Sequence, residues 1–251
     1  MGFLDKFKAE NMGRRAYGLH VQGNRLYDDG KAAEARPKHD EALRLYEEAM
    51  KAGCVKPAYL MAYGVLLLRY GRFEESKEAL LKAEHAPGIT KNEKRQLRIN
   101  FAICQWKLGN LDSAISQLKI AMNEAPNGVI YGSLGYILIE KARQTGDFTE
   151  AVAFNQQALD YDDEDAVVLD NMGQLNLAMG NEEKALEYFT RAHELKPRQV
   201  DTLYYLARIA GKNGDKAKAV EYLNSALDGN YSGLCTTTRQ QALDLKAEME
   251  K

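Results

Sequence analysis

The chain has 251 residues, of which 45% are apolar and 28% are charged, and it contains five prolines. This composition is typical of a folded helical protein and is too apolar for a disordered one. The formal net charge of −2 gives no overall positive field, so we expect no direct binding of nucleic acid.

Membrane insertion and a disulfide framework are also disfavoured. The longest aliphatic run, residues 65–68, is far shorter than the roughly 20 apolar residues of a transmembrane helix or the roughly 7 to 15 of a secretion signal. Cys54, Cys104 and Cys235 are odd in number and far apart, which argues against disulfides and against a zinc site. We therefore expect a cytoplasmic protein.

The first 15 residues contain a short amphipathic pattern. Phe3, Leu4 and Phe7 fall on one side of a helix, and lysines flank them. A helix of this kind typically covers the exposed end of a repeat array, so we predict that residues 1–15 form an N-terminal capping segment. The alternatives are that it reaches into a groove, in the same molecule or through self-association, or that it touches a membrane surface.

Two ladders of small residues run through the chain from residue 16. The second ladder begins at Ala42, and its members follow one another at steps of 34, 38, 37, 34 and 34 residues. Each member is followed seven residues later, or about two helical turns, by an alanine. A period near 34 is typical of helix-turn-helix repeats. The first ladder comprises Gly23, Gly64, Ala102, Gly135, Gly173 and Ala207, and the second Ala42, Ser76, Ala114, Ala151, Ala185 and Ala219.

Turn residues separate the two helices of each predicted unit. At Gly180 and Asn181, glycine accepts the left-handed backbone that ends one helix, and we expect the asparagine side chain to cap the next. Asp147 and Glu150 form a pattern that resembles a capping box. The predicted units are residues 16–56, 57–94, 95–127, 128–165, 166–199 and 200–233, and residues 234–251 are predicted to form a C-terminal capping helix.

The fifth unit carries the clearest family pattern. Its first helix has Leu169 and the pair Met172 and Gly173, and its second has Ala185, Phe189 and Ala192 before Pro197. This pattern resembles the tetratricopeptide repeat, and the resemblance covers residues 16–233. It implies an all-α, right-handed superhelical solenoid of about six repeats with terminal capping helices, about 13 helices in all.

In this family the first helices of successive repeats line a concave groove, and the resemblance implies which residues face it. The second unit independently shows two apolar stripes, and a helix apolar over so wide an arc either packs on both sides or presents one side to a partner. The stripe could therefore equally pack against neighbouring first helices. The expected partner-binding residues are Met61, Val65, Leu68, Ile99, Ile103, Trp106, Tyr136, Ile139, Tyr204 and Arg208.

No catalytic, cofactor or metal motif is present in the sequence. The histidines lack the i, i+4 spacing of a helical metal pair, and there is no phosphate-binding loop or nucleophile elbow. We expect a non-enzymatic scaffold that binds a peptide or helical segment of a partner protein, without a cofactor or metal. The alternatives are a regulatory sensor of a short free peptide, a peripheral membrane-associated assembly factor, and an enzyme whose site is assembled from distant residues.

Overall fold

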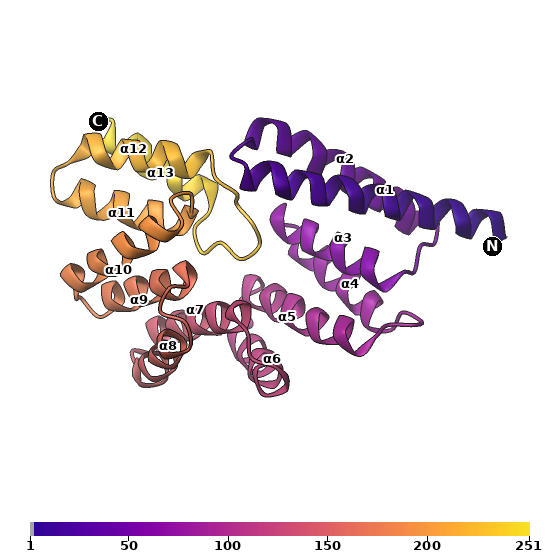
Figure 1. The fold of residues 1–251 in the computed structure, drawn as a ribbon, viewed down its shortest axis with the longest axis horizontal. Helices are drawn as coiled ribbons and strands as arrows, with labels where there is room; N and C mark the ends of the chain where they lie inside the picture. Colours follow the sequence, from indigo (N-terminus) through magenta and orange to yellow (C-terminus); the bar gives the residue numbers. More distant parts are fainter. Residues whose placement is uncertain (1–2) are drawn as a thin grey trace. The chain divides into compact units, whose positions relative to one another are not determined.

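The computed structural model describes the backbone of residues 3–251 and the side chains from Asp5 onward. Within this range the chain forms thirteen α-helices and no strand, and Figure 1 shows them following one another as antiparallel hairpins. The prediction of an all-α repeat fold is confirmed. The chain divides into two compact units, Met1–Gln117 and Leu118–Lys251.

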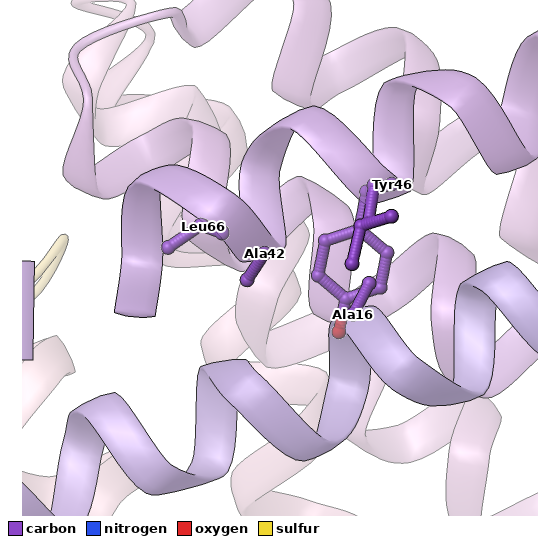
Figure 2. Packing of buried hydrophobic residues seen from close by; sticks show 5 residues of the cluster. Ala16, Ala42, Tyr46 and Leu66 are labelled. Carbon is purple, nitrogen blue, oxygen red and sulfur yellow. The ribbon is translucent and has the colours of Figure 1, made fainter. Parts of the chain in front are cut away.

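The N-terminal unit contains two and a half hairpins. Its first helices form one layer, because α1 packs on α3 and α3 on α5, while α2 packs on α1 and α4 on α3. Apolar residues from three helices meet at the core, where Figure 2 shows Ala16, Ala42, Tyr46 and Leu66 converging. The helices are α1 (Phe3–Asp28), α2 (Ala32–Lys51), α3 (Pro57–Arg69), α4 (Phe73–Glu84), α5 (Lys91–Lys107) and α6 (Leu111–Glu124), the last of which crosses the boundary between the units.

The C-terminal unit repeats this arrangement and ends in a single helix. The first helices α7, α9 and α11 pack side by side, and α13 covers α11 and α12. Ala242 of α13 is fully buried in this contact. The helices are α7 (Gly128–Thr145), α8 (Thr149–Tyr161), α9 (Ala166–Ala178), α10 (Glu182–Leu195), α11 (Val200–Lys212), α12 (Lys216–Leu227) and α13 (Arg239–Met249).

The first helix differs from the expected one. α1 continues from Phe3 to Asp28 with no break near residue 15, so the predicted capping segment and the first repeat helix share one helix. Ala9 is fully buried against Ala49 and Cys54, whereas Phe7 is 57% exposed. Phe7 therefore does not cap this chain's own core. The side chains of Phe3 and Leu4 lie outside the described residues.

The small-residue ladders lie where the paired helices cross. All six residues of the second ladder, and the six alanines that follow them, are at most 1% exposed. A Cβ atom on Gly173 would lie 2.6 Å from the ring of Phe189, which is too close. The absence of a side chain at residue 173 is therefore what lets α9 and α10 approach each other.

The predicted turns are correct in their glycines and wrong in two of their caps. Gly180 and Gly214 have φ values of 83° and 86°, in the left-handed region that favours glycine. The Asn181 side chain, however, makes no cap hydrogen bond. Asp147 forms no capping box, because α8 begins at Thr149 and the Asp147 carboxylate accepts from the Thr149 N–H. A one-residue shift in a helix start changes which group a side chain can reach.

Enlarging Ala185 tests the close helix crossing. Ala185→Leu should lower the free energy of unfolding by about 1 to 3 kcal/mol, since the residue is fully buried and extra methylenes overpack the contact. Urea denaturation followed by circular dichroism measures the change. The matched control is Lys184→Leu at an exposed neighbour, where we expect about 0.5 kcal/mol or less. Equal effects of the two variants would contradict the assignment of Ala185 to the crossing.

Candidate protein-binding face

The predicted groove residues of the N-terminal unit are mostly inaccessible. Met61, Leu68, Ile99 and Ile103 are between 3% and 8% exposed, so their side chains form part of the core. Val65 and Trp106 are half-buried. The Lys107 ammonium lies 3.8 Å from the centre of the Trp106 indole ring, which places a cation on the face of this aromatic side chain.

The four predicted residues of the C-terminal unit divide in the same way. Tyr136 and Ile139 are buried, Tyr204 is half-buried, and Arg208 is exposed. The Arg208 guanidinium lies 6.0 Å from the ring of Tyr204 and 5.7 Å from that of Tyr205. Of the ten predicted residues, six are thus buried within the chain, and a binding role for any of the ten remains a prediction.

Two aspartates outside the ten expected partner-binding residues form the most unusual feature of the C-terminal unit. Asp170 of α9 and Asp201 of α11 are 3% and 9% exposed. The Asp170 carboxylate accepts hydrogen bonds from the Thr202 hydroxyl and from the Gln174 side-chain amide, both at 2.7 Å. Buried carboxylates are uncommon because their desolvation is costly, so these partners are needed to offset it.

The Asp201 carboxylate binds main-chain groups from a distant segment. It accepts hydrogen bonds from the backbone N–H of Thr236 at 3.0 Å and of Thr237 at 2.7 Å. The Thr236 hydroxyl also lies 3.4 Å from the Gln174 side-chain nitrogen. We call the surface formed by Asp170, Gln174, Asp201 and Thr202 the α9–α11 face; it holds residues 236–237 chiefly through their backbone.

Burial and mutual repulsion perturb both acids. Loss of hydration, followed by the charge of Asp201, raises the pKa of Asp170. Burial also raises the pKa of Asp201, although the N–H groups of Thr236 and Thr237 oppose that change by favouring its charged form. The pair therefore retains protons at pH values at which exposed aspartates are ionised.

Some polar atoms near the pair have no protein partner. The Gln174 and Gln199 side-chain oxygens and the Tyr231 hydroxyl are buried without a hydrogen bond among the described residues. An unsatisfied buried acceptor costs about 1 to 3 kcal/mol. The α9–α11 face therefore has capacity for further N–H donors.

The sequence held one signal for this face. Asp170 directly follows the apolar run AVVL at the start of α9, and a carboxylate that is buried in such a place needs a hydrogen-bond partner. Asp201 gave no signal, because an acid in the first turn of a helix is ordinary. The hydrogen bonds of Asp201 to residues 236–237 depend on tertiary contact alone.

The N-terminal unit brings two histidines together. The rings of His20 and His39 are both buried, with centroids 5.4 Å apart, and the His39 Nε2 lies 3.3 Å from the His20 carbonyl oxygen. Burial lowers the pKa of His20 to about 3 and that of His39 to about 4, so both are neutral at pH 7. No group of three or more metal-ligating side chains occurs within the part of the chain described.

The N-terminal unit also has a cavity of about 860 Å³, which is lined by residues of α2, α3 and α4. Cys54, Leu60 and Tyr63 line it, and Arg72 at its edge pairs with Glu47. Burial raises the pKa of the Cys54 thiol, which keeps the sulfur protonated and weakly nucleophilic at neutral pH. The cavity thus offers an apolar surface without an activated nucleophile.

The hairpins, their small-residue crossings and the layer of first helices define a helical-repeat protein. The chain belongs to the tetratricopeptide repeat family, because a family model described as "Tetratricopeptide repeat" matches residues 21–88 and 171–233, more than half of the sequence. This confirms the resemblance seen in the sequence. In this family the repeats serve as a protein-interaction scaffold and are typically not enzymes.

Two curated proteins show partial sequence similarity. Photosystem I assembly protein Ycf3 of Acaryochloris marina (strain MBIC 11017) is 33% identical over 85 residues, which is 34% of this chain and 49% of that protein. The protein of the same name from Rippkaea orientalis (strain PCC 8801 / RF-1) is 31% identical over 80 residues, covering 31% and 46%. The chain therefore spans about half the length of the curated relatives it matches.

Solved structures agree on the fold. TTC0263, a thermophilic TPR protein of Thermus thermophilus, superposes with a TM-score of 0.59 at 19% identity, covering 77% of this chain and 97% of that one. The APC/C hetero-tetramer Cut9-Hcn1 contains a chain with a TM-score of 0.58 at 15% identity, covering 94% of this chain and 46% of that one. At these identities the likeness concerns the fold alone.

Proposed function

We propose that this chain is a non-enzymatic scaffold that binds an extended segment of a partner protein on the faces of its first helices. The supporting observation is that the α9–α11 face already holds a non-helical segment, residues 236–237, through two consecutive main-chain N–H groups. Backbone hydrogen bonds supply affinity for extended peptides, while neighbouring side chains supply specificity. Tyr204 and Arg208, which lie on the same helix α11 as Asp201, offer aromatic and cationic contacts for that purpose.

We propose that this activity takes place in the cytoplasm during the assembly of a protein complex. The two curated relatives are named as assembly proteins, which fits a scaffold that holds a partner during assembly. Cys54, Cys104 and Cys235 form no disulfide among the described residues, in keeping with a reducing cytoplasm. Within residues 3–251 no helix has both the length and the apolar character needed to cross a membrane. A sensor of free peptides would use the same first-helix faces.

Selection from a displayed library of random peptides, each about 15 residues long, tests the proposal. Peptides that bind the wild-type chain should lose about thirtyfold or more in affinity, about 2 kcal/mol, with Trp106→Ala or with Tyr204→Ala. Both residues are half-buried on first helices, and Tyr204 also packs against the core of its unit, so affinities are compared only for variants that are folded. Fluorescence anisotropy gives the dissociation constants, and circular dichroism verifies the fold.

The matched control is Tyr188→Ala, because Tyr188 is a half-buried tyrosine on the second helix α10. Its removal should leave the affinity within about threefold of wild type. Peptides that lose affinity with Tyr188→Ala and keep it with both first-helix variants would place binding on the opposite surface. Failure to select any binding peptide would also count against the proposal.

A further inference from the structure

The segment between α12 and α13 folds back onto the first helices of the C-terminal unit. Figure 1 shows this loop extending beside α11 before the chain enters α13. Thr237 in the loop is 4% exposed, so the contact excludes water. The segment that covers the α9–α11 face therefore comes from the same chain, about 35 residues after Asp201.

The contacts are those that a bound peptide would make. Two successive N–H groups, of Thr236 and Thr237, donate to the Asp201 carboxylate, and the Thr236 hydroxyl lies within reach of the Gln174 amide. Main-chain groups are the same in every residue except proline, so any extended segment with two consecutive free N–H groups could make the bonds to Asp201. A small side chain with a hydroxyl group could make the contact with the Gln174 amide.

The loop contacts neighbouring helices at its two ends, and the residues between them form hydrogen bonds with one another. The Arg239 guanidinium donates to the Leu227 carbonyl oxygen across its base, and a Cβ on Gly229 would lie 2.5 Å from the Val200 side chain. Between these points the Ser232 and Cys235 N–H groups bond to carbonyls two and three residues earlier. None of these contacts involves residues 236–237, so none of them has to break when residues 236–237 leave Asp201.

The fit between the loop and the face is incomplete. The Gln174 side-chain oxygen has no hydrogen-bond partner although this residue is fully buried, and the Gln199 side-chain oxygen is also unpaired. A segment with additional N–H donors would satisfy these acceptors, which the loop does not. A second ligand therefore has a route to bind more favourably than the loop.

We propose that residues 230–238 act as a built-in competitor, occupying the α9–α11 face until a partner segment with consecutive main-chain N–H donors and a small hydroxyl side chain displaces them. This inference rests on the proposed function, since it needs a partner that binds first-helix faces. While the loop occupies the face, the partner cannot bind there. The apparent dissociation constant for the partner is therefore the intrinsic one divided by the fraction of molecules in which the face is open.

The test uses a variant in which the loop cannot reach Asp201. Thr236→Pro combined with Thr237→Pro removes both N–H donors and leaves α9 and α11 unchanged. The probe is a fluorescein-labelled synthetic peptide of residues 230–238, measured by anisotropy in the presence of a reductant. We expect the proline variant to bind this peptide at least tenfold more tightly than the wild-type chain does.

Two further variants assign the effect to the face. Adding Asp201→Ala to the proline variant should abolish the gain, because the acceptor for the peptide N–H groups is then missing. The control Leu234→Pro places a proline in the same loop at a residue that is 47% exposed and whose N–H bonds locally to Ser232. It should bind the peptide no better than wild type. If the double variant fails to fold, Thr237→Pro alone removes the shorter bond and gives the same comparison.

Equal affinity of the wild-type and proline variants would overturn the competitor role, as would a gain that survives Asp201→Ala. These failures differ from failure of the proposed function. If display-selected peptides still bind the wild-type chain through Trp106 or Tyr204, the scaffold function stands and residues 230–238 are a structural loop only. If neither probe binds any variant, both proposals fail.

Discussion

Replacing Phe189 with alanine is expected to lower the free energy of unfolding of the C-terminal unit by about 3 to 5 kcal/mol. The Phe189 ring is fully buried, lies against Gly173 and stacks on Tyr205 with 5.2 Å between ring centres. Gly173 has no side chain that could move into the space left by the ring. The loss therefore includes both the transfer of the ring from water and the cavity that remains.

Urea denaturation followed by circular dichroism measures this loss. The matched control is Leu186→Ala on the same helix, where the side chain is 38% exposed and we expect about 1 kcal/mol or less. A loss below about 1 kcal/mol for Phe189→Ala would show that the ring does not fill the crossing of α9 and α10. The small-residue interpretation of that crossing would then be wrong.

Asp170→Asn should make the chain more stable at pH 7 and flatten the dependence of its stability on pH. Burial and Asp201 raise the pKa of Asp170 in the folded chain above its value in the unfolded chain. Its contribution to stability is therefore fully present below about pH 4 and is lost as the pH rises through the folded-state pKa. Each unit of pKa shift corresponds to about 1.4 kcal/mol, so we expect the effect to be on the order of several kcal/mol.

In the wild-type structure the Gln174 side-chain nitrogen faces the Asp170 carboxylate. An asparagine fits the site when the Gln174 amide turns by 180°, because the Gln174 side-chain oxygen, which has no partner in the wild-type structure, then accepts from the asparagine NH2 group. Denaturation from about pH 4.5 to about pH 7.5 compares the variant with wild type, and Asp163→Asn in an exposed loop serves as the control.

The buried histidines of the N-terminal unit act in the opposite direction, since their lowered pKa values cost stability as the pH falls below about 6.5. These histidines are present in wild type and in both variants, so their contribution to stability cancels when the three proteins are compared. Parallel pH profiles for wild type and Asp170→Asn would contradict the prediction.

The repeat architecture could be predicted from local spacing. The alanines of the second helices recur about every 34 to 38 residues, and all are buried. Gly180 and Gly214 end helices in the left-handed conformation, as expected. These features are readable because each depends on residues within one hairpin, where helical periodicity and turn chemistry fix the geometry. Cap hydrogen bonds were less predictable, since Asn181 and Asp147 depend on the exact helix start.

Exposure of the predicted groove was decided by tertiary packing. Met61 and Ile139 belong to apolar stripes, and in sequence a stripe that faces a neighbouring helix is identical to one that faces a partner. Trp106 and Tyr204 belong to the same predicted set and remain half-buried. Which stripe is covered depends on the distance and angle of the next repeat, and neither is encoded in the spacing of residues within one helix.

The sequence by itself determined the helices, their pairing and the positions of the close crossings, because these follow from short-range periodicity. Only the tertiary structure brought Asp201 to Thr236 and Thr237 and buried Asp170 beside them. An acid in the first turn of a helix and a run of threonines before another are each ordinary in isolation. Their hydrogen bonds arise because the chain returns over its own first helices, and that return depends on contacts across about 35 residues that no local pattern specifies.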